Sequence, residues 1–291
     1  MALSLSSVPD VIARIGDARD VAFGSYFLPH GPMREALIRA AERGAHVAVT
    51  LQADPYRNPD GKRDNREAAR LLSAAGAEVT LLRSSRVPFH LKAAVCDGIA
   101  YLDDRNWTAR GPEMVVADDD PSDVAIVQDA VRNARAGGDA TLATRKDEAL
   151  RREVQLIEAA GDEPVTVETE RVRSSPLTEA LRRHARAGAP TTLVVGRTKH
   201  HSRAERSALR SLARDGVVVR EGGTNEKLAL VGNAAWIGSG NATGAWGRDA
   251  KQIEWGVITH DVSLVNAVRS ALERDVASRA GGLVGNCSRS G

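Results

Sequence analysis

One stretch of this sequence occurs nearly twice, in copies at residues 90–106 and 225–241. The copies have the same length, and each has a lysine two residues after its first residue. The residues that they share are Lys92 and Asn106 in the first copy and Lys227 and Asn241 in the second. Their first residues differ, because His90 opens the first copy and Asn225 opens the second. We therefore expect two related halves that gather these side chains around one small anion.

The similarity extends into the flanking sequence. Residues 32–45 and 176–189 are identical at eight of fourteen positions, and both indicate a helix with proline in its first turn and glycine near its end. Further helices are expected at residues 9–15, 65–75, 121–135, 145–160, 203–214 and 262–279. Strands are expected at residues 20–28, 46–52, 78–83, 93–96, 101–102 and 113–117, and again at 165–172, 191–196, 217–220, 228–231, 235–237 and 254–259.

Alternating strands and helices predict an α/β fold, with a mixed, largely parallel sheet in each half. We expect two tandem α/β/α repeats, residues 1–138 and 139–291, that meet near Gly137 and Gly138. Repeats of this length are duplicated domains rather than solenoid units. Packed as a pseudo-twofold pair, they would bring the same surface to the axis, where both lysine motifs could share one site. The chain would then be a monomer with an internal pseudo-dimer.

The residue types in the repeated stretch suit phosphoryl chemistry. Residues i and i+2 of a strand point to the same face, so His90 and Lys92 would project together. An imidazole can attack phosphorus and form a covalent intermediate. Lysine ammonium and asparagine amide groups can stabilise the negative charge of the phosphoryl oxygens. With two lysines in that role, the reaction would require neither a metal ion nor another cofactor.

The two copies resemble the signature of the phospholipase D superfamily, which is HxK, four residues, Asp and a GSxN element, present twice. The matching residues are His90, Lys92, Asp97 and Asn106 in the first copy and Lys227, Ser239 and Asn241 in the second. The resemblance covers nearly the whole chain and implies two phospholipase D-like repeats that cleave phosphodiester bonds without a metal. It also implies that His90 becomes the phosphohistidine, and that Glu113 and Glu254 stand where a glutamate hydrogen-bonds a catalytic histidine.

The chain departs from this signature in both copies. Asn225 replaces the second histidine, which in the family protonates the leaving group, and Gly232 replaces the second aspartate. In the first copy, Asp104 occupies the serine position. Because a carboxylate repels a phosphate, we expect Asp104 either to be protonated and act as the missing acid or to pair with Arg105.

Three histidines are further candidates for the missing acid. His200 and His201 follow a predicted strand of the second half, and His30 follows a predicted strand of the first. Such loops commonly hold ligands, although a basic surface patch and a turn are the alternative interpretations. The candidate substrate-binding residues are Asn225, Ser239, Asp104, His200 and His201.

Composition narrows the remaining possibilities. Only 3% of the residues are aromatic, which argues against a broad platform for stacking bases. Cys96 and Cys287 provide neither a disulfide framework nor a metal-binding spacing. The sequence has no recognisable signal peptide and no apolar run of about 18 residues, so we expect a cytoplasmic protein.

The predicted function is a metal-independent phosphodiesterase that acts through His90. Arginine-rich stretches such as residues 171–173 and 199–206 favour nucleic acid over phospholipid as the substrate. The alternative is an impaired family member that binds a phosphate-bearing ligand, either nucleic acid or a lipid head group, without turnover. Asn225 and Asp104 are the reasons for this alternative.

Overall fold

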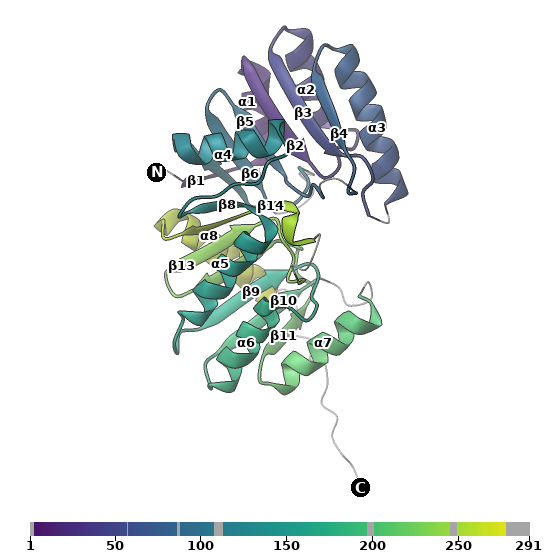
Figure 1. Cartoon of the computed structure of the whole chain (residues 1–291). Helices are drawn as coiled ribbons and strands as arrows, with labels where there is room; N and C mark the ends of the chain where they lie inside the picture. Colours follow the sequence, from purple (N-terminus) through teal and green to yellow (C-terminus); the bar gives the residue numbers. More distant parts are fainter. Residues whose placement is uncertain are drawn as a thin grey trace.

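The chain folds into two similar halves, each built on a seven-stranded sheet with helices packed against it (Figure 1). The computed structural model describes residues 3–56, 58–85, 88–107, 113–196, 201–244 and 249–277. In Figure 1 the first half, coloured purple to teal, lies above the second half, coloured teal to yellow.

The first half contains four helices and seven strands in the described residues. In chain order these are β1 (Leu3–Ser6), α1 (Val8–Asp17), β2 (Asp20–Ser25), α2 (Pro32–Glu42), β3 (His46–Gln52), α3 (Pro59–Ala74), β4 (Glu78–Leu82), β5 (Ala93–Cys96), β6 (Ile99–Asp103), β7 (Val115–Asp118) and α4 (Pro121–Arg132). The strands lie in the order β1-β7-β6-β5-β2-β3-β4.

The second half repeats this arrangement. Its elements are β8 (Leu142–Arg145), α5 (Lys146–Glu158), β9 (Val165–Thr169), α6 (Pro176–Arg186), β10 (Thr191–Val195), α7 (Arg203–Arg214), β11 (Val218–Glu221), β12 (Leu228–Val231), β13 (Ala234–Gly238), the short 3₁₀ helix η2 (Asp249–Lys251), β14 (Ile253–Thr259) and α8 (Val262–Ala277). The strand order β8-β14-β13-β12-β9-β10-β11 matches the first sheet strand for strand.

The α/β class, the two tandem repeats and the mixed sheets are confirmed, but the expectation of largely parallel sheets is wrong. Parallel pairing is confined to β2–β3–β4 in the first sheet and β9–β10–β11 in the second. These strands are joined through helices, which is the connection that parallel neighbours need. The other pairs are antiparallel, and tight turns join β5 to β6 and β12 to β13.

Side-chain caps fix where several helices begin. Ser202 and Glu205 form a capping box at the start of α7. Asn58 caps α3 by accepting a hydrogen bond from the backbone N–H of Gly61. As a result, α3 begins at Pro59 rather than at residue 65, the start expected from its apolar spacing.

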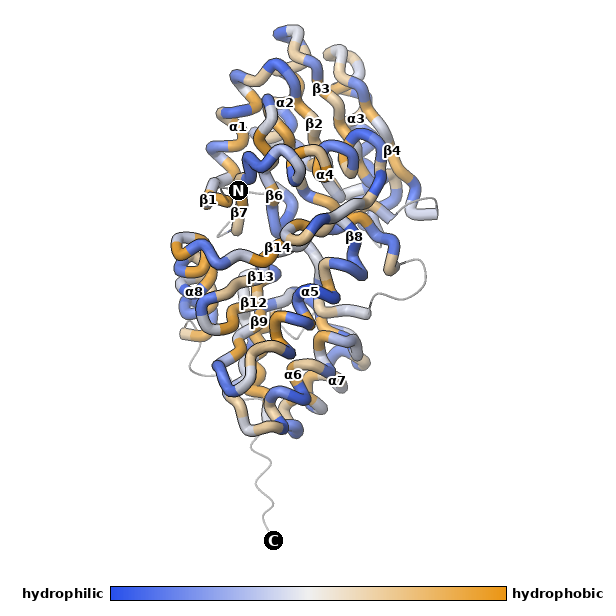
Figure 2. Tube along the Cα trace, turned by 60° about the vertical axis from the view of Figure 1, so that its left-hand side comes forward, coloured by the Kyte–Doolittle hydropathy of each residue, from blue (hydrophilic) through white to orange (hydrophobic). Residues whose placement is uncertain are grey.

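The two halves share one hydrophobic core. A single cluster of buried side chains includes Phe89 and Leu102 from the first half and Leu228 and Trp255 from the second. The tube in Figure 2 shows hydrophobic stretches along the strands of both halves, including β14 near their junction. Across the same junction, the indole Nε1 of Trp255 donates to the backbone oxygen of Asp103 at 2.9 Å. The halves are therefore packed together rather than joined only through the chain.

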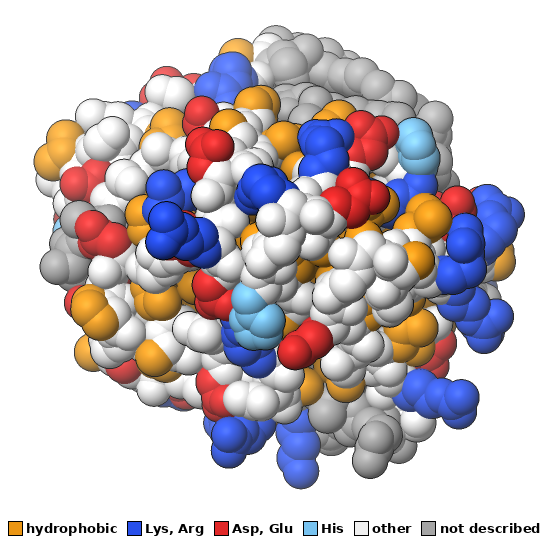
Figure 3. All heavy atoms as spheres, turned by 90° about the horizontal axis from the view of Figure 1, so that it is seen from above, with side chains coloured by type: hydrophobic (Ala, Val, Ile, Leu, Met, Phe, Trp, Pro, Cys, Tyr) orange, Lys and Arg blue, Asp and Glu red, His pale blue; other side chains and the backbone are white. Residues whose placement is uncertain are grey.

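At the end of the first half that lies farthest from the second half, the visible surface is not dominated by side chains of one charge. In the view from above, basic and acidic side chains are interspersed over this surface (Figure 3). Within the described residues, no helix is both long enough and apolar enough to cross a bilayer.

Candidate active site between the two halves

His90 lies where the backbones of the two halves meet. Phe89 and Ile253 form an isolated parallel bridge, and Ile253 is the first residue of β14. The N–H of His90 donates to the oxygen of Ile253 at 2.9 Å, and the N–H of Ile253 donates to the oxygen of Pro88 at 2.9 Å. This pairing puts Glu254, the next residue of β14, beside the imidazole.

The two nitrogens of the His90 ring have charged neighbours. Nδ1 lies 2.9 Å from Oε1 of Glu254, whose side chain is only 3% exposed. Nζ of Lys92 lies 2.8 Å from Nδ1 and 3.0 Å from Nε2. The ring of Tyr26 packs edge-on at 4.7 Å between centroids. Burial and the charge of Lys92 lower the pKa of His90 to about 4, so the imidazole is neutral above that pH.

The two motif lysines converge on this position although each comes from a different half. Lys92 and Lys227 are 1% and 4% exposed. Burial, followed by the charge of Lys227, lowers the pKa of Lys92 to about 7, and the charge of Lys227 also lowers the pKa of His90. Nζ of Lys227 donates to the backbone oxygen of Asn225 at 2.7 Å and lies 3.8 Å from a carboxylate oxygen of Glu170. An anion bound between the lysines would therefore relieve the repulsion between their charges.

A third buried lysine, which we did not predict from the sequence, stands behind Glu254. Lys146 is the first residue of α5, is 8% exposed, and lies 3.4 Å from Oγ1 of Thr243 and 3.3 Å from Oε1 of Gln252. Burial alone would raise the pKa of Glu254, but the charge of Lys146 and the bond to His90 outweigh burial and lower it. Glu254 is therefore held ionised. No motif marks Lys146, because only the pairing of β8 with β14 brings α5 to this place.

Comparison with known proteins gives a family match for most of the first half of the chain. Residues 11–133 match the family described as "Cardiolipin synthase, PLD-like domain". This part of the chain is therefore similar to phospholipase D-like domains. Comparison with curated proteins gave no match.

Three solved structures are similar to all or part of this chain. Polyphosphate kinase from Porphyromonas gingivalis aligns over 94% of the chain with a TM-score of 0.67 and 14% identity, and the chain spans half the length of that protein. Nuc from Salmonella typhimurium, a phospholipase D family member, and NucT from Helicobacter pylori each align over 45% of this chain and 92% of their own. Their TM-scores are 0.37 and 0.38, and their identities are 18% and 17%. The likeness to the kinase shows that both halves have a fold found in that protein.

The serine and asparagine positions of the phospholipase D-like motif hold the backbone around the site. Oγ of Ser239 accepts the N–H of Trp255 at 3.0 Å. Oδ1 of Asn241 accepts the N–H of Arg171 at 3.1 Å and so holds the loop that follows β9. Asn106 is half-buried, and among the described residues its Oδ1 has no hydrogen-bond partner.

Asp104 occupies the position equivalent to Ser239 and makes the equivalent bond. Its Oδ1 accepts the N–H of Met114 at 3.0 Å, as Ser239 accepts that of Trp255. Its Oδ2 reaches across the junction to the N–H of Lys227 at 3.3 Å. Burial and the charge of Asp103 raise the pKa of Asp104 well above its ordinary value. Oδ1 thus fixes the backbone at Met114, and Oδ2 fixes the backbone that carries Lys227.

The other candidates for the acid lie in different surroundings. His201 is 5% exposed, and its Nε2 lies 3.2 Å from the backbone oxygen of Glu170. His30 is largely exposed and lies 3.8 Å from Glu35 of α2. His200 falls outside the described residues. The half-buried Glu113 lies near Asp103, and after burial its charge is the main cause that raises the pKa of Asp103 to about 7.

The motif aspartate has a structural position. Asp97 follows β5 at the end remote from Lys92 and accepts the backbone N–H of Arg19 at 3.1 Å and of Asp20 at 2.9 Å. The equivalent Gly232 has a positive φ of 54°, close to the 47° of Asp97. An added Cβ at Gly232 would lie 1.7 Å from a carboxylate oxygen of Glu163, so glycine suits the different packing there.

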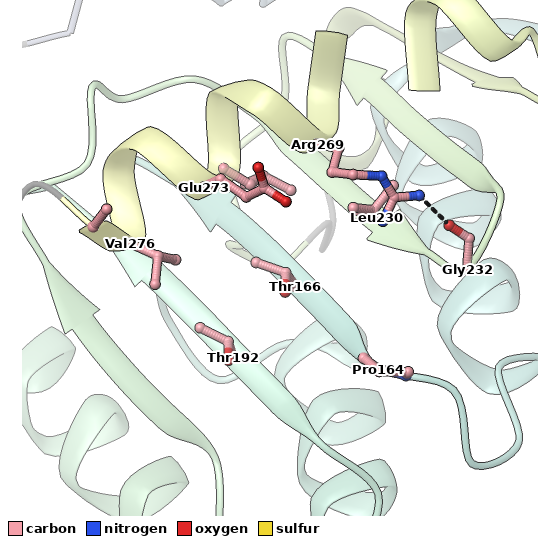
Figure 4. A pocket seen from close by; sticks show the side chains of 10 residues that line it. Pro164, Thr166, Thr192, Leu230, Gly232, Arg269, Glu273 and Val276 are labelled. Atoms are coloured by element: carbon pink, nitrogen blue, oxygen red, sulfur yellow. Dashed lines mark hydrogen bonds between the residues drawn. The ribbon is translucent and has the colours of Figure 1, made fainter. Parts of the chain in front are cut away.

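A separate hollow lies between α8 and the strands of the second sheet (Figure 4). Thr166, Thr192 and Leu230 line it, and Arg269 crosses it to donate to the backbone oxygen of Gly232 at 2.9 Å. It contains none of the motif side chains that converge on His90.

Proposed function

We propose that this protein is a metal-independent phosphodiesterase that forms a covalent phosphoryl intermediate on His90. The observation that carries the proposal is the contact between one neutral imidazole, the ionised carboxylate of Glu254 and the ammonium group of Lys92. A carboxylate on one ring nitrogen fixes the tautomer and stabilises the imidazole as it gains positive charge. Lys227 provides a second ammonium group for the same anion.

The contacts of the ring indicate which nitrogen attacks. With the Nδ1 proton donated to Glu254, the lone pair of Nε2 is directed away from that carboxylate. Nε2 would form a bond to phosphorus while the bond from phosphorus to the leaving oxygen breaks. Lys92, 3.0 Å from Nε2, would stabilise the phosphoryl oxygens during this step. Water would then attack phosphorus, break its bond to Nε2 and release the phosphate product.

The lowered pKa values predict an acidic optimum. Attack requires neutral His90, which exists above pH about 4, and anion binding requires charged Lys92, which exists below pH about 7. We expect kcat/KM, which reports the free enzyme, to be highest between these values, whereas ordinary values of 6.5 and 10.5 would place the optimum on the alkaline side of neutrality. Initial rates across the pH range would measure it. Lys92→Arg should remove the alkaline decline, and an optimum above pH 8 would contradict the assignment.

A basic groove beside the site favours a polyanionic substrate. Lys62 and Arg66, one turn apart on α3, and Arg83 after β4 line a hollow of about 470 Å³. In the part of the chain that the structure describes, none of these three cations has a carboxylate within ion-pair distance. Asp54 also lines the groove, but Gln52 and Ser84 donate to its carboxylate at 2.6 to 2.9 Å. The groove therefore offers net positive charge to a ligand.

Two contacts connect this groove to His90. Oε1 of Gln52, the last residue of β3, accepts the N–H of Phe89 at 2.8 Å. The hydroxyl of Tyr26, whose ring packs on His90, accepts the N–H of Tyr56 at 2.5 Å. A strand of nucleic acid with one phosphate at His90 could thus place another near Lys62 and its neighbours. We propose nucleic acid rather than phospholipid as the substrate class.

The test measures the unmodified protein and one variant on each of two substrates. EDTA-treated protein should cleave both a single-stranded oligonucleotide and bis(p-nitrophenyl) phosphate, because neither reaction relies on a metal. Replacing Lys62, Arg66 and Arg83 together by alanine should lower kcat/KM for the oligonucleotide about 10- to 100-fold and reduce its salt dependence, because phosphate contacts are lost. Cleavage of the small ester should not change.

Other outcomes separate the alternatives. An equal loss on both substrates would remove the argument for nucleic acid. Tight binding of the oligonucleotide without any cleavage of either substrate would instead support a phosphate-binding protein without turnover, which is the second candidate because Asn225 stands in place of a histidine.

A further inference from the structure

The pseudo-symmetry of the halves shows which residue of the second half is equivalent to Tyr26, the residue that packs on His90. Tyr26 is the first residue after β2, and Glu170 is the first residue after β9. Each lies six residues before the proline that begins the next helix, Pro32 in α2 and Pro176 in α6. Tyr26 and Glu170 are therefore equivalent positions.

Each of these two residues lies against the lysine motif of its own half. The ring of Tyr26 packs 4.7 Å from the ring of His90, and Nζ of Lys92 lies 5.9 Å from its centroid. In the second half, a carboxylate oxygen of Glu170 lies 3.8 Å from Nζ of Lys227. A carboxylate thus occupies in the second half the place that a phenol ring occupies in the first.

Asn225 is turned away from the place of the missing histidine. Its backbone has a positive φ of 72°, a conformation that asparagine adopts readily and that His90 does not have. A Cβ added to Gly196 would lie 2.4 Å from Oδ1 of Asn225 and 3.5 Å from the backbone oxygen of Glu170. The asparagine side chain therefore packs against the loop at Gly196, and it leaves the space beside Lys227 to the Glu170 carboxylate.

Hydrogen bonds hold the loop that carries Glu170 while its side chain stays accessible. His201 contacts its backbone oxygen at 3.2 Å, and Asn241 accepts the N–H of Arg171 at 3.1 Å. Oγ1 of Thr169 donates to the oxygen of Arg171 at 3.1 Å. The Glu170 side chain is 45% exposed, so a substrate can reach it.

We propose that Glu170 replaces the absent second histidine as the proton donor and acceptor of the reaction. This inference rests on the proposed function and deepens it. As Nε2 of His90 bonds to phosphorus and the phosphorus–oxygen bond breaks, the protonated Glu170 carboxyl would give its proton to the leaving oxygen, which departs as an alcohol. The carboxylate would then take a proton from the water that attacks phosphorus while the bond to His90 breaks, which restores both residues.

The surroundings of Glu170 support this cycle. The charges of Lys227 and Lys92 both interact with Glu170, and both lysines would be engaged by the phosphate of a bound substrate. That negative phosphate favours the protonated form of a neighbouring carboxyl. Two of the other candidate acids are less available, because both oxygens of Asp104 accept backbone hydrogen bonds and the His201 imidazole lies against the Glu170 backbone.

The test uses leaving groups of different acidity. The phenyl and p-nitrophenyl esters of thymidine 5′-phosphate carry the same phosphoryl group, but only p-nitrophenol leaves readily without a proton. In single-turnover release of the phenol, Glu170→Gln should slow the phenyl ester about 10²- to 10⁴-fold, the usual effect of losing a general acid, and the p-nitrophenyl ester at most about 10-fold. Glu170→His should recover most of the rate with the phenyl ester. Glu273→Gln, the same change at an exposed position of α8, is the matched control.

The possible results distinguish a failure of the Glu170 role from a failure of the proposed function. An equal loss on both esters, or none, in a Glu170→Gln protein that still forms the phosphohistidine would overturn the role of Glu170 and leave the proposed function standing. Absence of any adduct on His90 in the unmodified protein would overturn the proposed function and this inference with it. A thermal unfolding curve for each variant shows whether a lost rate reflects lost folding.

Discussion

Alanine in place of His90 should abolish turnover of every phosphodiester that the unmodified protein cleaves, with EDTA present throughout. The imidazole is the group whose ring nitrogens contact both Glu254 and Lys92, so its removal leaves the site without a nucleophile. Loss of a nucleophile costs about 10⁴-fold or more in rate even when the rest of the site persists. The measurement is the initial rate on bis(p-nitrophenyl) phosphate.

A second readout identifies the residue that reacts. Protein mixed with substrate and denatured in alkali should carry a phosphoryl group on His90 that acid removes, and the His90→Ala protein should carry none. His46→Ala is the control, because His46 is half-exposed and pairs with Asp20 and Glu78 at the far end of the first sheet. Unchanged turnover in His90→Ala would rule out the proposed mechanism.

The second large effect is expected from Glu254→Gln. This carboxylate is 3% exposed, lies 2.9 Å from Nδ1 of His90 and is kept ionised by Lys146. A glutamine has nearly the same size but lacks the charge that stabilises the developing imidazolium. We expect kcat to fall about 10²- to 10⁴-fold with little change in KM, as when the carboxylate partner of a catalytic histidine is replaced.

Nitrogen NMR of ¹⁵N-labelled histidine separates this role from a merely structural one. In the unmodified protein, His90 should hold its proton on Nδ1, and Glu254→Gln should alter that tautomer balance. Glu158→Gln is the matched control, because Glu158 pairs with Arg183 on the surface of the same half. A fall in rate with an unaltered tautomer would indicate that Glu254 supports the fold rather than the chemistry.

Local signals account for much of the fold. Proline, glycine and apolar spacing place α2 and α6 within a few residues, since these signals act on the chain itself. The four-residue edge strands β1 and β8 are not predicted, because such short segments become strands only by pairing with β7 and β14. The share of parallel pairing was overestimated for the same reason, because strand direction depends on which neighbours meet.

The candidate site also has features that the sequence predicts and features that it does not. The HxK spacing places His90 and Lys92 on one face of an extended segment, a local property that a sequence expresses. The resemblance named two glutamates, but it could not tell which of them would contact His90. The bridge between Phe89 and Ile253 brings Glu254 to it, and that contact spans more than 150 residues.

By itself, the sequence determined that this chain has two related halves, that each half has a motif with a lysine, and that only the first motif begins with a histidine. Only the tertiary structure decided that Lys92 and Lys227 face the same space, that Lys146 stands behind Glu254, and that the carboxylate of Glu170 lies beside Lys227. The physical reason is that spacing along a strand fixes only the directions of nearby side chains. The packing of one half against the other determines which distant charges come close enough to change each other's protonation.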